Sequence, residues 1–273
     1  MDTMYKTKYI KYKKKYLILK TQYNILKAID DICSIDNKTF ELIDIKLTKK
    51  EIDIINDFQS VKLPPTPLNY FGTINNQNLF EIIEEYFSKS IGVDVYGKTV
   101  SNILLNKVAI PFLNSLNLDS LWLTIRIMVP NDLYEIPRWH TDGFYYKLRE
   151  KNYQLKLAGT LIGPGTLFKK DDIEMKNEFF EISNNLYKDF DYNNFDSEKD
   201  LKYRKIINKK LQHFEIIQPL NDQIAIFCVG DPEKSAVHSE PNIDQNRIFF
   251  SIVPGSIYDI KKLAERFKGE FQY

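Results

Sequence analysis

The sequence predicts an α+β fold in which helices fill the first half of the chain and short strands fill the second. Between about residues 78 and 116, apolar residues recur with the 3.6-residue period of helices that face a core. After Leu121 the pattern changes to short β-branched or aromatic runs bounded by turn residues, which is typical of strands. Hydrophobic residues make up 43% of the 273 residues, as expected of a globular protein.

The N-terminal segment predicts a helix with a heptad seam. Its aromatic and apolar residues follow one another at steps of four and three, at Tyr5, Tyr9, Tyr12, Tyr16, Leu19, Tyr23 and Leu26. Such a helix can mediate self-association or partner binding, or act as a basic arm on phosphates. Packing of the seam on its own domain is favoured, because a seam made mostly of tyrosine is weak as a free-standing coiled coil.

A strand and a capped helix are predicted next. Residues 40–47 alternate as a strand does, and Thr48 with Glu51 forms a capping-box pattern that opens a helix through about Phe58. The three prolines between Lys62 and Leu68 cannot continue a helix or a central strand. We therefore expect a helical extension over residues 1–62 and the main domain over residues 63–273.

The remaining elements follow in order. Helices are expected around residues 78–90 and 98–116, packed against a sheet. Strands are expected at 121–129, 137–146, 153–163, 214–220, 223–229 and 247–253. Residues 171–212 form a polar insertion that should be partly helical. It is either a lid over the substrate or a solvent-exposed segment far from the site.

Composition excludes several classes of protein. The formal net charge is +1, so the chain as a whole has no field that would gather nucleic acid or an anionic membrane. Cys33 and Cys228 lie far apart and make no disulfide framework. No apolar run reaches the length of a signal peptide or a transmembrane helix. We therefore expect a soluble, intracellular protein that is not secreted.

Two of the three histidines stand in patterns typical of metal ligands. His140 and Asp142 are two residues apart at a predicted strand, so their side chains should point the same way. His238 follows the apolar strand at 223–229 and a turn, and it can supply a second imidazole from a different strand. Two imidazoles and a carboxylate suit iron(II), because they leave open positions on the ion. His213 has no partner pattern and is interpreted as an ordinary surface or packing histidine.

Arg247 is the candidate anion-binding residue. It stands nine positions after His238 and opens the apolar run at 247–253. A guanidinium there would be costly to bury without an anionic partner, which can be a co-substrate carboxylate or a structural Asp or Glu. An isolated His-x-Asp pattern is weak evidence, but its coincidence with a distant histidine and this arginine favours a metal site over chance.

Together these residues resemble the iron(II)/2-oxoglutarate-dependent oxygenase superfamily, over roughly residues 121–255 and with the spacing of its prolyl-hydroxylase-like branch. The resemblance implies that His140, Asp142 and His238 hold Fe(II) and that Arg247 binds the distal carboxylate of 2-oxoglutarate. A second group often assists at that carboxylate, and Thr160, Tyr145, Lys156 or Ser251 is available here. The resemblance also implies a double-stranded β-helix, or jelly roll, with helices packed on one face.

The same resemblance implies the chemistry. Fe(II), 2-oxoglutarate and O2 would together hydroxylate a C–H bond, or demethylate an N-methyl group, and ascorbate would help in vitro. Halogenation is disfavoured, because related halogenases have a small residue where this chain has Asp142. A peptide side chain is the preferred substrate, from the spacing alone.

Other functions remain open. Nucleic acid or a small metabolite is an alternative substrate, and a jelly-roll metal-binding or interaction module without turnover is an alternative function. The Lys- and Tyr-rich opening residues resemble those of proteins from large DNA viruses, which implies a location in the host cytoplasm or the virion.

Overall fold

The computed structural model describes residues 3–58, 63–91, 94–147, 154–188, 190–191 and 194–273 of the chain. Its helices are α1 (Thr3–Ser34), α2 (Lys49–Asn56), α3 (Leu79–Ile91), α4 (Asp94–Asn102), the π-helix η1 (Ile103–Ala109), α5 (Ile110–Ser115), α6 (Ile173–Tyr187), α7 (Ser197–Lys210) and α8 (Ile257–Arg266). Its strands are β1 (Phe40–Asp44), β2 (Leu68–Thr73), β3 (Ser120–Met128), β4 (Gln154–Ile162), β5 (Leu167–Lys169), β6 (Ile216–Ile217), β7 (Gln223–Val229), β8 (His238–Ser239), β9 (Arg247–Gly255) and β10 (Phe271–Gln272).

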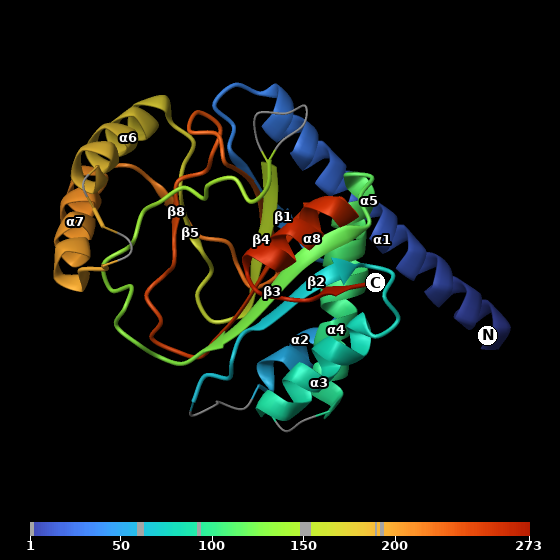
Figure 1. Ribbon diagram of the computed structural model, residues 1–273. Coiled ribbons are helices and arrows are strands. Elements are labelled where there is room, and N and C mark those ends of the chain that lie inside the picture. Colours follow the sequence, from blue (N-terminus) through green and yellow to red (C-terminus); the bar gives the residue numbers. More distant parts are fainter. Residues whose placement is uncertain (1–2, 59–62, 92–93, 148–153, 189, 192–193) are drawn as a thin grey trace.

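The strands form two sheets. The large sheet has the order β1-β7-β4-β9-β3-β2-β10 and is antiparallel except for the last pair, while β6, β5 and β8 form a small sheet. Helices α1 and α3–α5 cover one face of the large sheet, and α6 and α7 lie on the opposite side of the molecule, beyond β5 and β8 (Figure 1). The mixed α and β composition expected from the sequence is confirmed.

The core lies between the large sheet and its helices, and alternation along the strands produces it. On β3, every second residue, such as Leu123 and Ile125, is buried against the helices together with Leu157 of β4 and Ile252 of β9. The residues between them face the other way, toward the small sheet. The large sheet therefore has an apolar face for the helices and a second face that is free to carry polar groups.

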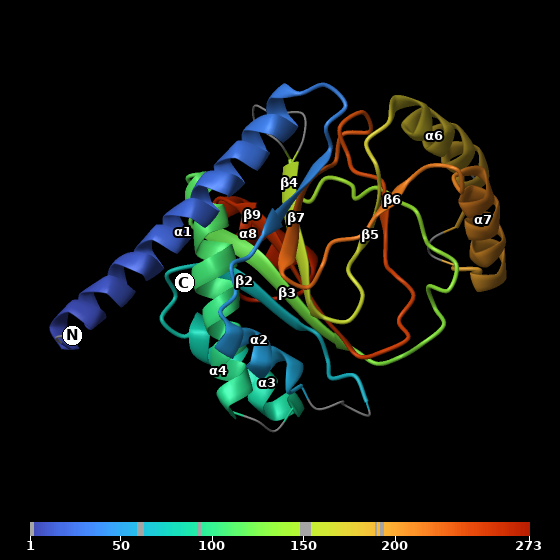
Figure 2. The same cartoon turned by 180° about the vertical axis from the view of Figure 1, so that it is seen from behind.

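The predicted N-terminal extension shares this sheet and this core. Strand β1 pairs antiparallel with β7 at one edge of the large sheet (Figure 2). The predicted capping box is confirmed, with Thr48 and Glu51 bonding each other's backbone N–H at the start of α2. The end of the proline-rich segment runs directly into β2, which the sequence did not predict. Proline is tolerated here because it precedes the first paired residue, Leu68.

Helix α1 packs through a different stripe from the heptad seam. Ile25, Ala28 and Ile32 are buried in the core, while Tyr16 and Tyr23 are 62% and 66% exposed. Tyr12, Leu19 and Leu26 are exposed as well. The expectation that the seam packs on its own domain is therefore wrong for these five residues. The side chains of Tyr5 and Tyr9 fall outside the described residues.

Several predicted strands differ from the observed ones. The strands predicted at 121–129, 223–229 and 247–253 are confirmed as β3, β7 and β9, and that at 153–163 as β4, although Tyr153 lies outside the described residues. Of the strand predicted at 214–220, only the two residues of β6, Ile216–Ile217, form a strand. Residues 137–146 form no strand and make one bridge, between His140 and His238. The insertion is partly helical, as predicted, and contains α6 and α7. None of the described helices is long and apolar enough to span a membrane.

Candidate metal centre

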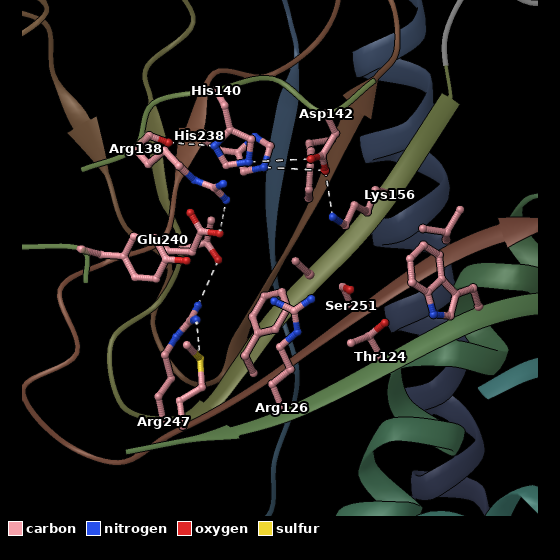
Figure 3. Close-up of a pocket in the computed structure, with 18 of the residues that line it drawn as sticks. Thr124, Arg126, Arg138, His140, Asp142, Lys156, His238, Glu240, Arg247 and Ser251 are labelled. Carbon is pink, nitrogen blue, oxygen red and sulfur yellow. Dashed lines mark hydrogen bonds and ion pairs between the residues drawn. The ribbon is translucent and has the colours of Figure 1, made fainter. Parts of the chain in front are cut away.

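A cavity of about 250 Å³ opens between the free face of the large sheet and the segments that carry the two candidate histidines. The large sheet forms the floor of the cavity, and the side chains on its free face line it: Thr124, Arg126 and Met128 of β3, Lys156 and Ala158 of β4, Phe227 of β7, and Arg247, Phe249 and Ser251 of β9. The opposite side of the cavity is lined by Tyr134, Arg138, His140, Asp142, Tyr145, Thr166, His238 and Glu240. The cavity therefore gathers polar side chains that are distant in the sequence (Figure 3).

A pair of backbone hydrogen bonds places the two histidines side by side. The N–H of each donates to the carbonyl of the other, and both bonds are 2.9 Å long. The pairing does not extend further because neighbouring groups find other partners. The N–H of Arg138 donates to the Ser239 hydroxyl, and the carbonyl of Asp142 accepts from the N–H of Gly230. This is why the predicted strand at 137–146 is reduced to one bridge.

The three candidate ligands converge on one point. Ligand atoms of His140, Asp142 and His238 all lie within 4.8 Å of one another. The Nε2 atom of each imidazole is 3.7 Å from a carboxylate oxygen of Asp142, Oδ1 for His140 and Oδ2 for His238. Among the described residues, this is the only group of three His, Cys, Asp or Glu side chains with such spacing.

Backbone carbonyls fix the tautomer of both histidines. Nδ1 of His140 lies 2.8 Å from the carbonyl of Arg138, and Nδ1 of His238 lies 3.0 Å from that of Ala236. A carbonyl only accepts, so Nδ1 carries the proton and donates it, which leaves the lone pair of each Nε2 free. Both lone pairs belong to the atoms nearest Asp142. Hydrogen bonds from Nδ1 to a fixed acceptor orient metal-binding histidines in this way, so the residues present suit a divalent transition metal.

Asp142 is held in its ionised form. Burial alone would raise its pKa, but attraction from Lys156 and the two imidazoles keeps the pKa well below its ordinary value. Lys156 Nζ lies 2.8 Å from Oδ2 of Asp142, and the Tyr145 hydroxyl donates to the same oxygen over 3.0 Å. Burial raises the pKa of Tyr145 to about 12, so its hydroxyl keeps its proton. A carboxylate ligand is therefore available without deprotonation.

Arg247 lies deep in the floor of the cavity, with 2% of its surface exposed. Its guanidinium donates to the carbonyl of Pro164 over 2.7 Å and to the hydroxyl of Thr166 over 3.2 Å, and it lies over the Phe249 ring. Within the described part of the chain, no carboxylate comes within 4.0 Å of it. Burial lowers its pKa to about 10, because desolvation disfavours the charged form.

The other candidate residues divide between the cavity and the interior. Tyr145 and Ser251 line the cavity, as does Lys156. Thr160 does not line it: its hydroxyl is buried on β4 and has no hydrogen-bond partner among the described residues. His213 is exposed and does not line the cavity, and its ring lies tilted against that of Phe214.

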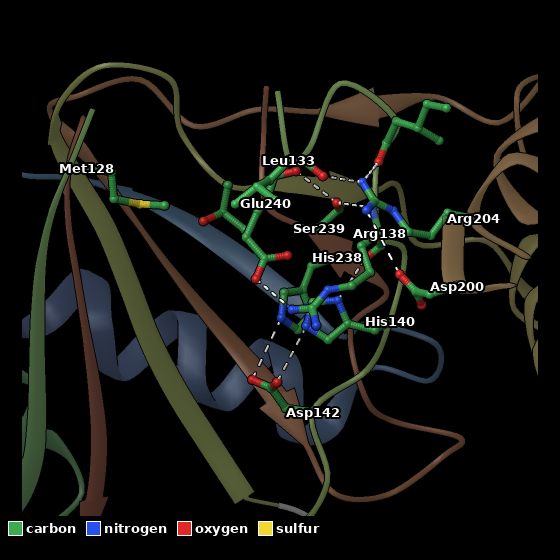
Figure 4. A network of polar contacts seen from close by, with 12 residues as sticks. Met128, Leu133, Arg138, His140, Asp142, Asp200, Arg204, His238, Ser239 and Glu240 are labelled. Carbon is green, nitrogen blue, oxygen red and sulfur yellow. Dashed lines mark hydrogen bonds and ion pairs between the residues drawn. The ribbon is translucent and has the colours of Figure 1, made fainter. Parts of the chain in front are cut away.

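The sequence reasoning missed a carboxylate at this site. Glu240 lines the cavity and accepts a hydrogen bond of 2.7 Å from Arg138. Figure 4 shows this contact beside the two histidines. Burial raises its pKa, but attraction from His140 and Arg138 outweighs burial and lowers it. The signal was present, since Glu240 follows His238 at the same two-residue interval that separates His140 from Asp142. Arg126 and Arg138 were also missed.

The insertion borders the metal centre. A second cavity, of about 520 Å³, shares Arg138 and His140 with the first. Its far wall is built by α6 and the following segment, through Phe179, Phe180, Tyr187 and Phe195. The insertion therefore lies beside the candidate metal ligands rather than far from them.

No protein-family model matches the chain, and no curated protein matches its sequence. Solved structures do match. A prolyl-4-hydroxylase from Pseudomonas putida is 9% identical, with 85% of this chain and 98% of that chain covered and a TM-score of 0.36. A viral collagen prolyl hydroxylase from Paramecium Bursaria Chlorella virus-1 is 13% identical, with 80% and 90% covered and a TM-score of 0.35.

A third match is the Kdo hydroxylase, a non-heme Fe(II) alphaketoglutarate dependent dioxygenase solved in complex with cobalt(II). It is 10% identical, with 92% of each chain covered and a TM-score of 0.40. The three identities and TM-scores are low, so the function has to be inferred from the site itself.

Proposed function

We propose that the chain is an iron(II)- and 2-oxoglutarate-dependent dioxygenase that hydroxylates a C–H bond. One observation carries the proposal. Two histidines with free Nε2 atoms and an ionised aspartate converge in the same cavity as a buried arginine that has no carboxylate partner among the described residues. The three ligands suit Fe(II) and leave positions open, and the arginine suits the far carboxylate of a dicarboxylic acid.

The fold is compatible with this function. We propose that the two facing sheets, with the site between them, are the double-stranded β-helix that the sequence resemblance implies. The large sheet supplies Arg247 and Lys156, and the opposite side supplies the three ligands. In such an architecture the ligands come from segments far apart in the chain, as they do here.

Each residue has a distinct role in the proposed reaction. His140, Asp142 and His238 would hold the metal, and the carbonyls of Arg138 and Ala236 would keep the imidazoles oriented. Arg247 would bind the distal carboxylate of 2-oxoglutarate. When bound, Fe(II), 2-oxoglutarate and O2 supply the oxidising chemistry, which releases succinate and carbon dioxide. The protein contributes orientation and exclusion of water.

The role of Lys156 differs between the two candidate functions. Its ion pair with Asp142 satisfies that carboxylate without any metal, as expected of a module that has no turnover. In the enzyme, the same ammonium would orient Asp142 or assist Arg247 at the co-substrate carboxylate. We favour the enzyme, because an ion pair alone gives no reason for two histidines with free Nε2 atoms beside it. Asp142 itself favours hydroxylation over halogenation.

The test is turnover of the co-substrate. The purified protein is incubated with Fe(II), 2-oxoglutarate, ascorbate and O2, and succinate is measured. His140→Ala, Asp142→Ala and His238→Ala should each abolish metal-dependent succinate release, and His213→Ala, the exposed histidine, should not. Arg247→Gln should raise the 2-oxoglutarate KM by at least about tenfold, the value of one charge-assisted hydrogen bond.

Absence of both succinate release and 2-oxoglutarate binding in the wild-type protein would favour the metal-binding module instead. The substrate itself is then sought among peptides first, and among nucleic acids and small metabolites as alternatives, by the succinate release that each one stimulates.

A further inference from the structure

The side chains that line the cavity carry a net positive charge that the proposed metal and co-substrate together do not neutralise. Four cationic side chains line it, Arg126, Arg138, Lys156 and Arg247, against two carboxylates, Asp142 and Glu240. A divalent metal adds two positive charges, and 2-oxoglutarate as a dianion removes two. With both bound, the described lining would still carry an excess of two positive charges, although the chain as a whole is nearly neutral.

Of the four cations, Arg126 is the one to which no anionic group has been assigned. Lys156 pairs with Asp142, Arg138 pairs with Glu240, and Arg247 is assigned to the co-substrate. Among the described residues, Arg126 pairs with β9 through its backbone, but its side chain makes no ion pair and no hydrogen bond. It stands on β3, an interior strand of the large sheet, and points from the floor into the cavity (Figure 3).

Arg126 and Arg247 lie close together but at different depths. In the register of β3 and β9, Arg126 is opposite Phe249 and Met128 is opposite Arg247, so the two arginines are diagonal neighbours on one face. Diagonal pairs are about 7–8 Å apart at their backbones, within reach of long side chains. Arg247 is buried, whereas Arg126 starts on the same face of the sheet but is exposed to solvent, and the solvent-exposed side of the cavity beside Arg126 is called its mouth. A ligand of Arg247 would therefore bind deep in the cavity. A second ligand that enters from solvent would contact Arg126.

We infer that the primary substrate carries an anionic group, a carboxylate or a phosphate, that Arg126 binds at the mouth of the cavity. This inference rests on the proposed function, because only then is 2-oxoglutarate the ligand of Arg247. A guanidinium in a partly desolvated cavity recognises such oxyanions through paired N–H donors. Arg126 thereby selects the substrate by charge and places its reactive C–H bond over the metal centre.

The experiment is a calorimetric titration of the protein loaded with zinc(II) and 2-oxoglutarate, which cannot turn over. The probe is benzenesulfonate, a weak ligand for zinc, and its neutral counterpart is methyl phenyl sulfone. Wild type should bind benzenesulfonate saturably, and Arg126→Gln should weaken binding by at least about tenfold. Arg126→Lys should keep most of it. Lys202→Gln, an exposed charge on α7 outside the cavity, should change nothing. The neutral sulfone should bind wild type no better than benzenesulfonate binds Arg126→Gln.

Two results would overturn the inference. One is benzenesulfonate binding that is absent in wild type or unchanged in Arg126→Gln. The other is a loss of 2-oxoglutarate affinity in Arg126→Gln as large as that in Arg247→Gln, which would assign both arginines to the co-substrate. Benzoate and phenyl phosphate, titrated in the same way, then show which oxyanion the site prefers.

Failure of the proposed function gives a different result. In that case wild type shows no zinc-dependent binding of 2-oxoglutarate. The benzenesulfonate titration is therefore repeated without zinc and 2-oxoglutarate. If binding still depends on Arg126, the anion site at the mouth is supported without the proposed function. If binding does not depend on Arg126, the anion site is ruled out.

Discussion

Lys156 Nζ lies 2.8 Å from Oδ2 of Asp142, so the carboxylate that would bind the proposed metal ion is already paired with an ammonium group. Both side chains are mostly buried, at 16% and 18% exposure, so neither charge is well solvated on its own. Removing one partner of such a pair leaves the other uncompensated. The metal and the lysine are therefore partly interchangeable as sources of positive charge for Asp142.

Lys156→Met should destabilise the metal-free protein by about 3 kcal/mol, because it leaves the carboxylate of Asp142 buried without its cation. Added zinc(II) should recover more stability in the variant than in wild type, since the ion replaces the lost charge. Urea unfolding with and without zinc(II) measures both effects. An equal gain from zinc(II) in the two proteins would mean that the metal does not bind at Asp142.

The pH dependence of stability should report His238. Burial and repulsion from His140 lower the pKa of His238 to about 4, from an ordinary value of 6.5. Between pH 4 and 6.5 the unfolded chain therefore binds a proton that the folded protein excludes. The free energy of unfolding of the metal-free protein should fall as the pH drops through this window, by at most about 3.5 kcal/mol at about 1.4 kcal/mol per pH unit.

The comparison of two variants isolates that contribution. His238→Asn should flatten the slope between pH 4 and 6.5, and His213→Asn, at the exposed histidine, should keep it. Urea unfolding at half-unit pH intervals provides the measurement. A slope that survives in His238→Asn would assign the proton uptake to another group.

Arg247→Met should separate stability from ligand binding. The guanidinium is buried without a carboxylate within ion-pair distance among the described residues, so an apolar side chain of similar length removes an unfavourable desolvation. We expect the metal-free variant to be as stable as wild type or more so, while 2-oxoglutarate no longer raises its melting temperature. A loss of more than about 2 kcal/mol would show that the bonds to Pro164 and Thr166 make Arg247 a structural residue.

Two adjacent residues of α1 test how the helix packs. Ile25 is fully buried and Leu26 is 45% exposed. Ile25→Ala should cost about 2–5 kcal/mol, because it opens a cavity in the core, whereas Leu26→Ala should cost about 0.5 kcal/mol or less. Thermal unfolding of the two variants is the measurement. Similar losses in both would mean that the heptad seam is buried in solution, by a second copy or by another partner.

The strands with the clearest alternation were predictable, because one face of each meets the helices and the other faces the cavity. That holds for β3, β7 and β9, where every second side chain joins the core beneath the helices and those between, such as Arg126, Phe227 and Ser251, face the cavity. The two-residue strands β6, β8 and β10 were not predictable at their observed lengths, because so few residues show no period. At residues 137–146, side chains and distant backbone groups take the hydrogen bonds that a strand would need.

The seam of α1 shows the limit of periodicity. Its heptad spacing correctly indicated a helix, but the helix packs through Ile25, Ala28 and Ile32 instead. Two stripes on one helix can both be apolar, and only the positions of the neighbouring elements, here α5 and β1, decide which is buried.

By itself the sequence determined which side chains are able to hold a metal, because His140, Asp142 and His238 stand at intervals that adjacent strands or turns can bring together. It also placed a guanidinium at the start of an apolar strand. Only the tertiary structure decided that all four meet in one cavity, that Lys156 and Glu240 join them, and that Arg126 is left over. The reason is that ligand geometry and charge balance depend on the register of strands far apart in the chain, which no local pattern encodes.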